Sequence, residues 1–230
     1  MLIKGLQKLT LLDFPGHIAC TVFTGGCNLR CPFCHNALLV TELDDEFIKE
    51  EDFFDFLKDR KGRLDGVAVT GGEPLLQKDA EQFIAKIKQL GFAVKLDTNG
   101  TFPDKLKQII DKKLVDYIAV DIKNSPQKYA VTVGLSHLDV DKIKQSVDMI
   151  MASGIDYEFR TTVPKELFEE NDFEEIGKFI KGAKRYFLQE FKDSGNLIEE
   201  GFFTPESKEQ MEKYASIARK YVDRAEVRGI

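Results

Sequence analysis

Short apolar runs alternate with longer amphipathic stretches along most of this chain of 230 residues. The apolar runs are rich in Val, Ile, Phe and Tyr and are short enough to be strands buried on both faces. They are residues 18–23, 66–70, 92–97, 115–121, 157–163 and 185–191. Helical spacing of apolar side chains marks residues 45–60, 78–90, 103–113, 140–153, 172–181 and 205–222. Six strand–helix units in series predict a parallel sheet with right-handed crossovers.

Residue types typical of helix ends mark two of these stretches. Phe83, Ile84 and Ile87 recur at helical spacing, and Gly91 follows where a C-terminal cap is expected. The pair Thr204-Pro205 is typical of a helix start, because the missing N–H of proline costs nothing there. We therefore expect one helix to end near residue 90 and another to begin near residue 205.

The number of units limits the architecture. Six are too few to close the barrel of eight strand–helix units. An open, partial barrel and a doubly wound sheet remain as alternatives, and both place functional residues at the carboxyl ends of the strands. We therefore expect the chemically unusual residues of this chain to follow its strands.

Three of the four cysteines lie close together, directly after the first apolar run. Cys27, Cys31 and Cys34 are too near one another for a disulfide framework, which ties distant segments together. Thiolates hold iron–sulfur clusters, and three of them leave one iron of a [4Fe–4S] cluster open. The alternative is a structural zinc site with His35 as fourth ligand, although adjacent side chains converge poorly on one tetrahedral ion. Cys20, inside an apolar run, is expected in the core.

Polar clusters also follow the next three runs. Gly71, Gly72 and Glu73 follow the second, and paired glycines let the backbone approach a ligand closely. The other clusters are Asp97, Thr98, Asn99 and Gly100 after the third run, and Asp121 and Lys123 after the fourth. Each alone is compatible with a solvated turn. Ligand or polar clusters at four successive strand ends predict one shared site.

Charge and hydropathy exclude other classes of protein. The net charge of −6 at pH 7 makes nucleic acid an unexpected partner, because a binder neutralises phosphates with clustered Lys and Arg. No stretch approaches the roughly 20 apolar residues of a membrane span. The first ten residues lack the apolar core of a signal peptide. We therefore expect a cytoplasmic protein that does not bind membranes.

These motifs together resemble the radical S-adenosylmethionine (SAM) superfamily. The resemblance rests on the C-x3-C-x2-C loop, on Phe33 before its last cysteine, and on GGEP at residues 71–74. DFPG at residues 13–16, the pair His35-Asn36, DTNG at 97–100 and DIK at 121–123 are similar to the activating enzymes of glycyl radical enzymes. The opening GLQKLTLLDFPG, the segment YEFRTTV and the closing VRGI are similar to the longer type of anaerobic ribonucleoside-triphosphate reductase activating protein.

The resemblance implies an α/β fold, an open, partial (β/α)6 barrel like part of a TIM barrel. It implies one domain over residues 1–230, with an N-terminal strand and turn at 1–17, the core at 18–191 and a C-terminal helix and tail at 192–230. It also implies a [4Fe–4S] cluster and SAM as cofactors. The 5′-deoxyadenosyl radical formed from SAM would take a hydrogen atom from a glycine Cα of a partner enzyme. A flavodoxin or ferredoxin would donate the electron.

The resemblance further implies roles for single residues. The cluster would be held by Cys27, Cys31 and Cys34. The implied SAM contacts are Phe33, Gly71, Gly72, Glu73, Asp97, Thr98, Asp121 and Lys123, and a monovalent cation near Asp97 and Thr98 is a further expectation. Other candidates are Asn36, Asn99, Arg160 and Gln189 for the SAM site, and Asp13 and Gly16 for the partner peptide. A structural ion pair is the alternative role for Arg160.

One departure from the family bears on the partner. Pyruvate formate-lyase activating enzymes carry a histidine near the end of the sixth strand, but residues 186–191 contain none, and Gln189 is the candidate substitute. That weakens pyruvate formate-lyase as the partner and favours the reductase. A radical SAM enzyme acting on a small molecule is an alternative, which the lack of a second cysteine cluster disfavours. His137 is expected at the surface.

Overall fold

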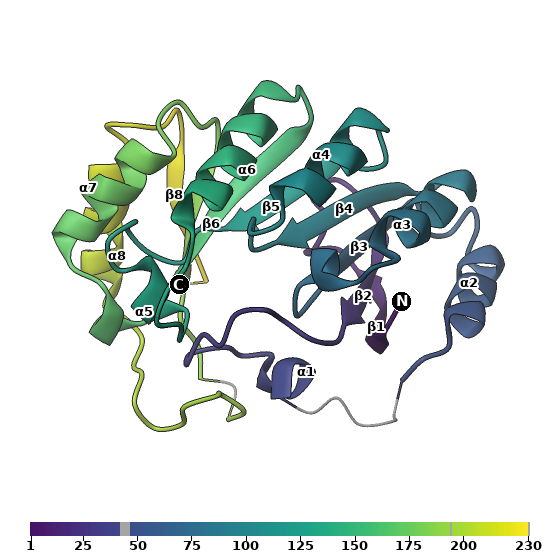
Figure 1. Ribbon diagram of the computed structural model, residues 1–230, viewed down its shortest axis with the longest axis horizontal. Coiled ribbons are helices and arrows are strands. Elements are labelled where there is room, and N and C mark those ends of the chain that lie inside the picture. The colour runs from purple at the N-terminus through teal and green to yellow at the C-terminus, as the bar shows by residue number, and fades with distance from the viewer. Residues whose placement is uncertain (42–46, 194, 230) are drawn as a thin grey trace.

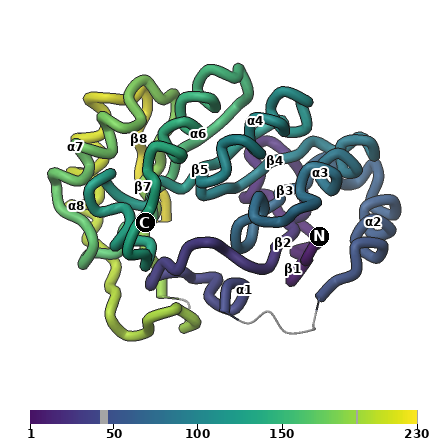
Figure 2. The backbone as a smooth tube through the Cα atoms, viewed as in Figure 1, coloured from purple at the N-terminus to yellow at the C-terminus, as the bar shows by residue number. Residues whose placement is uncertain are grey.

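The computed structural model describes residues 1–41, 47–193 and 195–229. One sheet of eight strands runs through this part of the chain in the order β1-β2-β3-β4-β5-β6-β7-β8. The strands are β1 Ile3–Thr10, β2 Ala19–Thr24, β3 Gly66–Gly71, β4 Ala93–Thr98, β5 Tyr117–Asp121, β6 Asp156–Val163, β7 Tyr186–Glu190 and β8 Ala225–Arg228. β1 is antiparallel to β2, whereas every later strand is parallel to its neighbour. β1 and β8 form the two ends of the sheet, which is therefore open (Figure 2).

Helices connect the strands. They are α1 Ala37–Thr41, α2 Glu50–Asp59, α3 Ala80–Gln89, α4 Pro103–Asp111, α5 Tyr129–Thr132, α6 Val140–Ala152, α7 Glu170–Phe179 and α8 Lys208–Ala218, with short 3-10 turns η1 Pro74–Leu76 and η2 Lys165–Leu167. Figure 1 shows α3, α4 and α6 on one side of the strands and α1 on the other. The buried face of α3 includes Phe83, Ile84 and Ile87, as their spacing predicted. The helices thus bury one side of the sheet and leave the other to the cysteine loop.

The predicted architecture is confirmed. The six predicted strands correspond to β2 through β7, and the partial barrel is open. The expectation for residues 192–230 was incomplete, because that stretch also contains β8, which extends the sheet beside β7. β8 is short and alternates Ala225 and Val227 with the charged Glu226 and Arg228, so it lacks the apolar run of the other parallel strands.

Helix ends follow the expected capping chemistry in one case and not in the other. Gly91, with φ +92°, follows α3 as predicted. The predicted start at Pro205 was wrong, because α8 begins at Lys208 after Ser207, whose side chain accepts a hydrogen bond from the N–H of Gln210. Residues 204 and 205 instead dock on the loop that contains η2. The helix predicted from residue 45 is α2, and residues 45 and 46 lie outside the described part.

The expected positions of Cys20 and His137 also agree with the structure. Cys20 is fully buried in the core, and His137 is exposed. Within the described ranges, no helix is long and apolar enough to cross a membrane.

The interior of the open barrel is partly charged. Side chains two residues apart on a strand share a face, which places Lys95 with Asp97 on β4 and Glu158 with Arg160 on β6. These side chains are mostly buried, so each needs a partner. The parallel arrangement of β2 through β7 directs their carboxyl ends to one edge, where the predicted polar residues lie.

Candidate active site

A cavity of about 400 Å³ lies where these strand ends meet the loop that carries the cysteines. It is lined by Gln7, Asp13, Thr21, Phe23, Cys27, Leu29, Cys31, Phe33, Cys34, His35, Asn36, Val40, Thr70, Gly71, Gly72, Asp97, Thr98, Asn99, Asp121, Lys123, Arg160, Thr162, Gln189 and Ile198. All predicted site residues are in this wall except Glu73 and Gly16. Residues distant in the sequence are therefore brought together as the strand-end rule predicted.

The cysteine loop, residues 25–36, is held by hydrogen bonds between its own residues. Arg30 Nη1 donates hydrogen bonds to the carbonyls of Cys27, at 2.6 Å, and Leu29, at 2.8 Å. The N–H of Cys34 donates to the carbonyl of Cys31 at 3.0 Å. These bonds hold the loop with Cys27, Cys31 and Cys34 in the cavity wall.

Burial opposes the ionisation of two of these thiols. Burial raises the pKa of Cys31 to about 12 and also raises the pKa of Cys27. A bound metal reverses this, because coordination deprotonates a thiol. Among the described residues, no three His, Cys, Asp or Glu side chains are placed to hold a single metal ion. An iron–sulfur cube binds each thiolate at a different iron, so its ligands need not converge on one point, and the three cysteines fit it.

The two glycines of residues 71–74 pack against the chain just before Cys27. A Cβ on Gly72 would lie 2.0 Å from the carbonyl oxygen of Gly26, and one on Gly71 would lie 2.3 Å from the N of Thr24. Gly71 also has φ +118°, which L side chains rarely adopt. Only glycine fits at either position, and the backbone at this strand end is left open to the cavity.

Glu73 lies behind the cavity wall, not on it. Its side chain is fully buried and accepts hydrogen bonds from the N–H of Leu75 at 2.9 Å, the hydroxyl of Thr98 at 2.8 Å and the N–H of Asn99 at 2.7 Å. Burial raises its pKa to about 7 although these three donors oppose the shift. Glu73 therefore joins the turn after β3 to the end of β4.

Asn99 continues this connection to the cysteine loop. Its Nδ2 donates to Oδ1 of Asn28 at 2.9 Å and lies 3.9 Å from Sγ of Cys27. Its Oδ1 accepts from the N–H and the hydroxyl of Thr101. A donor beside a ligand sulfur lowers the electron density that the sulfur offers a cluster.

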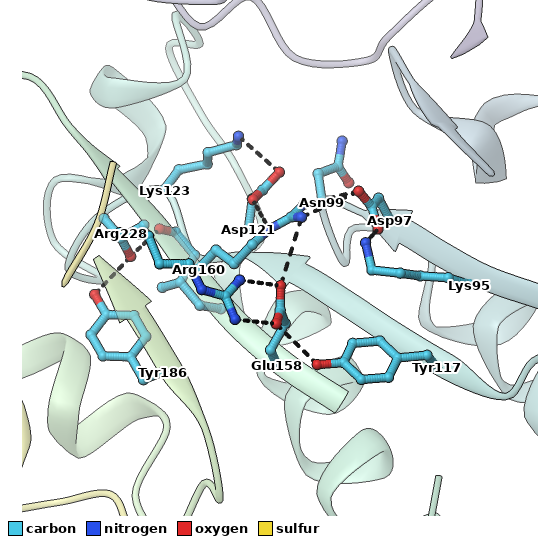
Figure 3. A network of polar contacts seen from close by, with 12 residues as sticks. Lys95, Asp97, Asn99, Tyr117, Asp121, Lys123, Glu158, Arg160, Tyr186 and Arg228 are labelled. Carbon is cyan, nitrogen blue, oxygen red and sulfur yellow. Dashed lines mark hydrogen bonds and ion pairs between the residues drawn. The ribbon is translucent and has the colours of Figure 1, made fainter. Parts of the chain in front are cut away.

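Ion pairs connect the ends of β4, β5 and β6 (Figure 3). Nε of Arg160 donates to Oδ1 of Asp121 at 3.0 Å, and its Nη1 and Nη2 lie 3.2 and 3.3 Å from Oδ2 of Asp97. Lys123 Nζ is 3.4 Å from Oδ2 of Asp121. Burial alone would raise the pKa of Asp121, but Arg160 and Lys123 hold it well below its usual range. The four side chains form a charged section of the cavity wall.

A second group of charges lies deeper in the barrel. Glu158 accepts hydrogen bonds from the hydroxyl of Tyr117 at 2.9 Å and from both Nη atoms of Arg228 at 3.0 Å. Lys95 bonds Oδ1 of Asp97. Lys95, Glu158 and Arg228 were not among the residues predicted from the sequence. A sequence signal exists for Lys95 and Glu158. Each lies two positions before another charged residue in a predicted buried strand, so the two charges share a face of that strand.

The turn between β1 and β2 contributes one of its two predicted residues. Asp13 lines the cavity and accepts a hydrogen bond of 2.5 Å from the hydroxyl of Thr21. Gly16 is exposed, with φ +80° and open space around it. Gln7, Thr21 and other wall residues of β1 and β2 were missed. Strand alternation places Thr21 with Phe23 on the inner face, which could have found them.

The chain is similar to several known proteins. Residues 21–180 match the radical SAM superfamily. A Methanocaldococcus jannaschii protein provisionally named as a glycyl-radical enzyme activating enzyme is 35% identical over 237 aligned positions, which cover 100% of this chain and 96% of that protein. The pyruvate formate-lyase-activating enzyme of Listeria monocytogenes is 32% identical over 146 positions, 55% of each chain.

Among solved structures, Streptococcus suis SuiB bound to the precursor peptide SuiA superposes with a TM-score of 0.70 at 15% identity. The superposition covers 91% of this chain and 48% of SuiB, so the present chain matches about half of that protein and the likeness concerns the fold. The sequence matches identify the family. This chain belongs to the radical SAM superfamily and, within it, to the enzymes that activate glycyl radical enzymes.

Proposed function

We propose that this enzyme installs the radical on an anaerobic ribonucleoside-triphosphate reductase. The proposal rests on one observation. Three cysteines and the polar residues at the strand ends line the same cavity of about 400 Å³. The family of the chain supports the activation of a glycyl radical enzyme as its activity. The choice of client is supported by Gln189, which lines the cavity where pyruvate formate-lyase activating enzymes are expected to have histidine.

The chain's own residues have distinct tasks in this proposal. Cys27, Cys31 and Cys34 hold a [4Fe–4S] cluster with one iron open to SAM. When bound, the reduced cluster and SAM supply a 5′-deoxyadenosyl radical, which takes a hydrogen atom from a glycine Cα of the client. Phe33, 4% exposed, offers an apolar surface to the adenine, and its ring packs edge-on against Phe203 with centroids 6.0 Å apart.

The methionyl end of SAM is assigned to the charged wall and the glycine turn. Gly71 and Gly72 leave backbone oxygens accessible to the amino group, because no side chain covers them. Lys123 suits the carboxylate by charge. Glu73 keeps the turn and the end of β4 in register through its three hydrogen bonds, so its role is positioning. Asn36, Asn99 and Gln189 complete the wall around the ligand.

The client peptide is assigned to the turn between β1 and β2. Asp13 reaches the cavity from that turn, and its bond to Thr21 fixes its direction. Gly16 at the exposed tip leaves room for an approaching chain. A flavodoxin or ferredoxin is the proposed electron donor, and the reducing cytoplasm, which keeps such thiols free, is the proposed compartment.

Electron paramagnetic resonance tests the proposal directly. The anaerobically reconstituted enzyme, SAM and a reductant are mixed with purified reductase, and the doublet of a glycyl radical should appear together with 5′-deoxyadenosine. The matched controls are Cys31→Ala in the enzyme and a reductase whose radical glycine is replaced by alanine. SAM cleavage without any doublet would contradict the activase assignment for this client.

Pyruvate formate-lyase is the second candidate client. The similarity to pyruvate formate-lyase-activating enzymes favours it. The same measurement with purified lyase in place of reductase separates the two, because a doublet on the lyase alone would reassign the client. Cleavage of SAM with transfer of hydrogen from neither protein would favour a small-molecule substrate.

A further inference from the structure

Asp97 already has a cationic partner at each carboxylate oxygen. Lys95, two residues earlier on β4, directs its ammonium at Oδ1 (Figure 3). Arg160 approaches Oδ2 with Nη1 at 3.2 Å and Nη2 at 3.3 Å. The side chain of Lys95 is 2% exposed, so its charge is enclosed in the barrel and not shared with solvent. Asp97 is therefore neutralised from within the protein.

The other residue expected to bind a monovalent cation is also engaged. The hydroxyl of Thr98 donates to Oε1 of Glu73 at 2.8 Å and accepts from the N–H of Gly100 at 3.2 Å. A metal cation at Asp97 would stand next to the buried ammonium of Lys95, and two like charges at such a short separation repel each other. The residues present thus do not fit a monovalent metal cation at this position.

The charge balance of the network supports the same view. Among the ion pairs of the described residues, four cations, Lys95, Lys123, Arg160 and Arg228, face three carboxylates, Asp97, Asp121 and Glu158. The cations therefore outnumber the carboxylates by one. Each of the three carboxylates already has a cationic partner, so none of them is left to bind a further cation.

We propose that the ammonium of Lys95 takes the place of a monovalent metal cation, holding Asp97 toward the methionyl end of SAM and making the enzyme independent of potassium and sodium. Lys95 is a positioning residue that acts through Asp97. This inference rests on the proposed SAM site. It replaces the expectation of a metal cation near Asp97 and Thr98.

The test measures SAM binding by equilibrium dialysis with the anaerobically reconstituted enzyme at matched ionic strength. The salt is potassium chloride in one arm and tetramethylammonium chloride, whose cation is too bulky for the site, in the other. The wild-type Kd should change by less than about twofold between them. Lys95→Met should weaken binding by about tenfold in tetramethylammonium and regain most of it in potassium, because one charge-assisted hydrogen bond is lost and the ion can replace it.

Lys107→Met is the matched control, since Lys107 is 59% exposed and pairs with Asp111 on the surface of α4. It should behave as wild type in both salts. A wild-type Kd that rises about tenfold without potassium would overturn the inference, and that arm needs no variant to fold. Potassium that fails to improve SAM binding by folded Lys95→Met would also overturn it.

Thermal unfolding of the unliganded proteins separates this inference from the proposed function. Potassium should raise the melting temperature of Lys95→Met relative to tetramethylammonium but leave the wild type unchanged, because only the variant has a vacant cation position. If potassium raises the melting temperature of Lys95→Met but the enzyme does not bind SAM, the proposed SAM site is wrong and the role of Lys95 stands. The absence of the shift would count against Lys95 itself.

Discussion

Nε of Arg160 on β6 lies 3.0 Å from Oδ1 of Asp121 on β5, and the same guanidinium extends past β5 to Asp97 on β4. One side chain thus fixes two carboxylates on different strands. Removing it takes one cationic partner from each carboxylate, leaving Asp97 with Lys95 and Asp121 with Lys123 in a site that is mostly closed to water.

We expect Arg160→Met to lower the free energy of unfolding by about 3–5 kcal/mol, the cost of breaking a buried ion pair from one side. Urea unfolding measures it. Arg185→Met is the control, because Arg185 forms a pair of 2.6 Å with the exposed Asp156, and its loss should cost less than about 1 kcal/mol. Equal losses for the two variants would show that the Arg160 network contributes no more than a surface pair.

The second prediction concerns the glycine turn after β3. Gly71 and Gly91 both have positive φ, +118° and +92°, but only Gly71 has backbone atoms where a Cβ would lie. Gly91→Ala should cost about 1–2 kcal/mol for its backbone conformation alone. Gly71→Ala should cost clearly more and should abolish SAM binding, because β2 must move. Denaturant melts of the two variants check this, and comparable melting points would contradict the steric reading.

The third prediction is a pH dependence from Glu73. Its pKa of about 7 in the folded state compares with 4.5 as its ordinary value. Between these values the folded protein holds a proton that the unfolded chain has released, so the contribution of Glu73 to stability is complete below pH 4.5 and is lost as pH rises through 7.

Glu73→Gln cannot titrate. In the cluster-free protein, the unfolding free energy of wild type minus that of the variant should therefore fall by about 2 kcal/mol between pH 5 and pH 8. Chemical denaturation at several pH values measures it, and Glu81→Gln, at a half-buried carboxylate near the surface, controls for the removal of a charge. A difference that stays constant with pH would argue that Glu73 is ionised throughout.

The fourth prediction separates the two kinds of cysteine. Cys27→Ala, Cys31→Ala and Cys34→Ala should each lose the iron–sulfur absorbance after anaerobic reconstitution, because three thiolates are needed to hold the cluster. Cys20→Ala should keep it, with a loss of stability of about 1 kcal/mol from the core. A visible cluster of full intensity in any of the three loop variants would exclude that residue as a ligand.

Sequence periodicity predicted the sheet well because the parallel strands are buried on both faces. The run from Tyr117 to Asp121 is apolar until its last residue. Both the strand and the end of it that faces the site could therefore be predicted. β8 was not predicted because it is an edge strand in which two of the four residues are charged. Its pairing with β7 depends on the tertiary fold and not on a local pattern. The start of α8 was misplaced because Thr204 bonds Glu166 instead of capping a helix.

The site was predictable as a set of residues but not as a set of contacts. Cys27 and Asp97, which line the cavity, were singled out because unusual residues at strand ends stand out from the apolar pattern. The burial of Glu73 behind the wall depends on donors from Leu75, Thr98 and Asn99, which no local pattern reveals. The charge pattern of β4 could have placed Lys95 on the same face as Asp97, but only the fold brings Arg160 to that carboxylate as well.

The sheet follows chain order from β1 to β8, and this has a consequence for how the protein forms. Each strand can pair with the one synthesised just before it, so the barrel can grow during translation without waiting for distant segments. Arg228, on the last strand, then completes the partners of Glu158. A nascent chain therefore acquires its cysteine loop early and its full set of internal charges only at the end, which would delay a functional centre until synthesis is nearly finished.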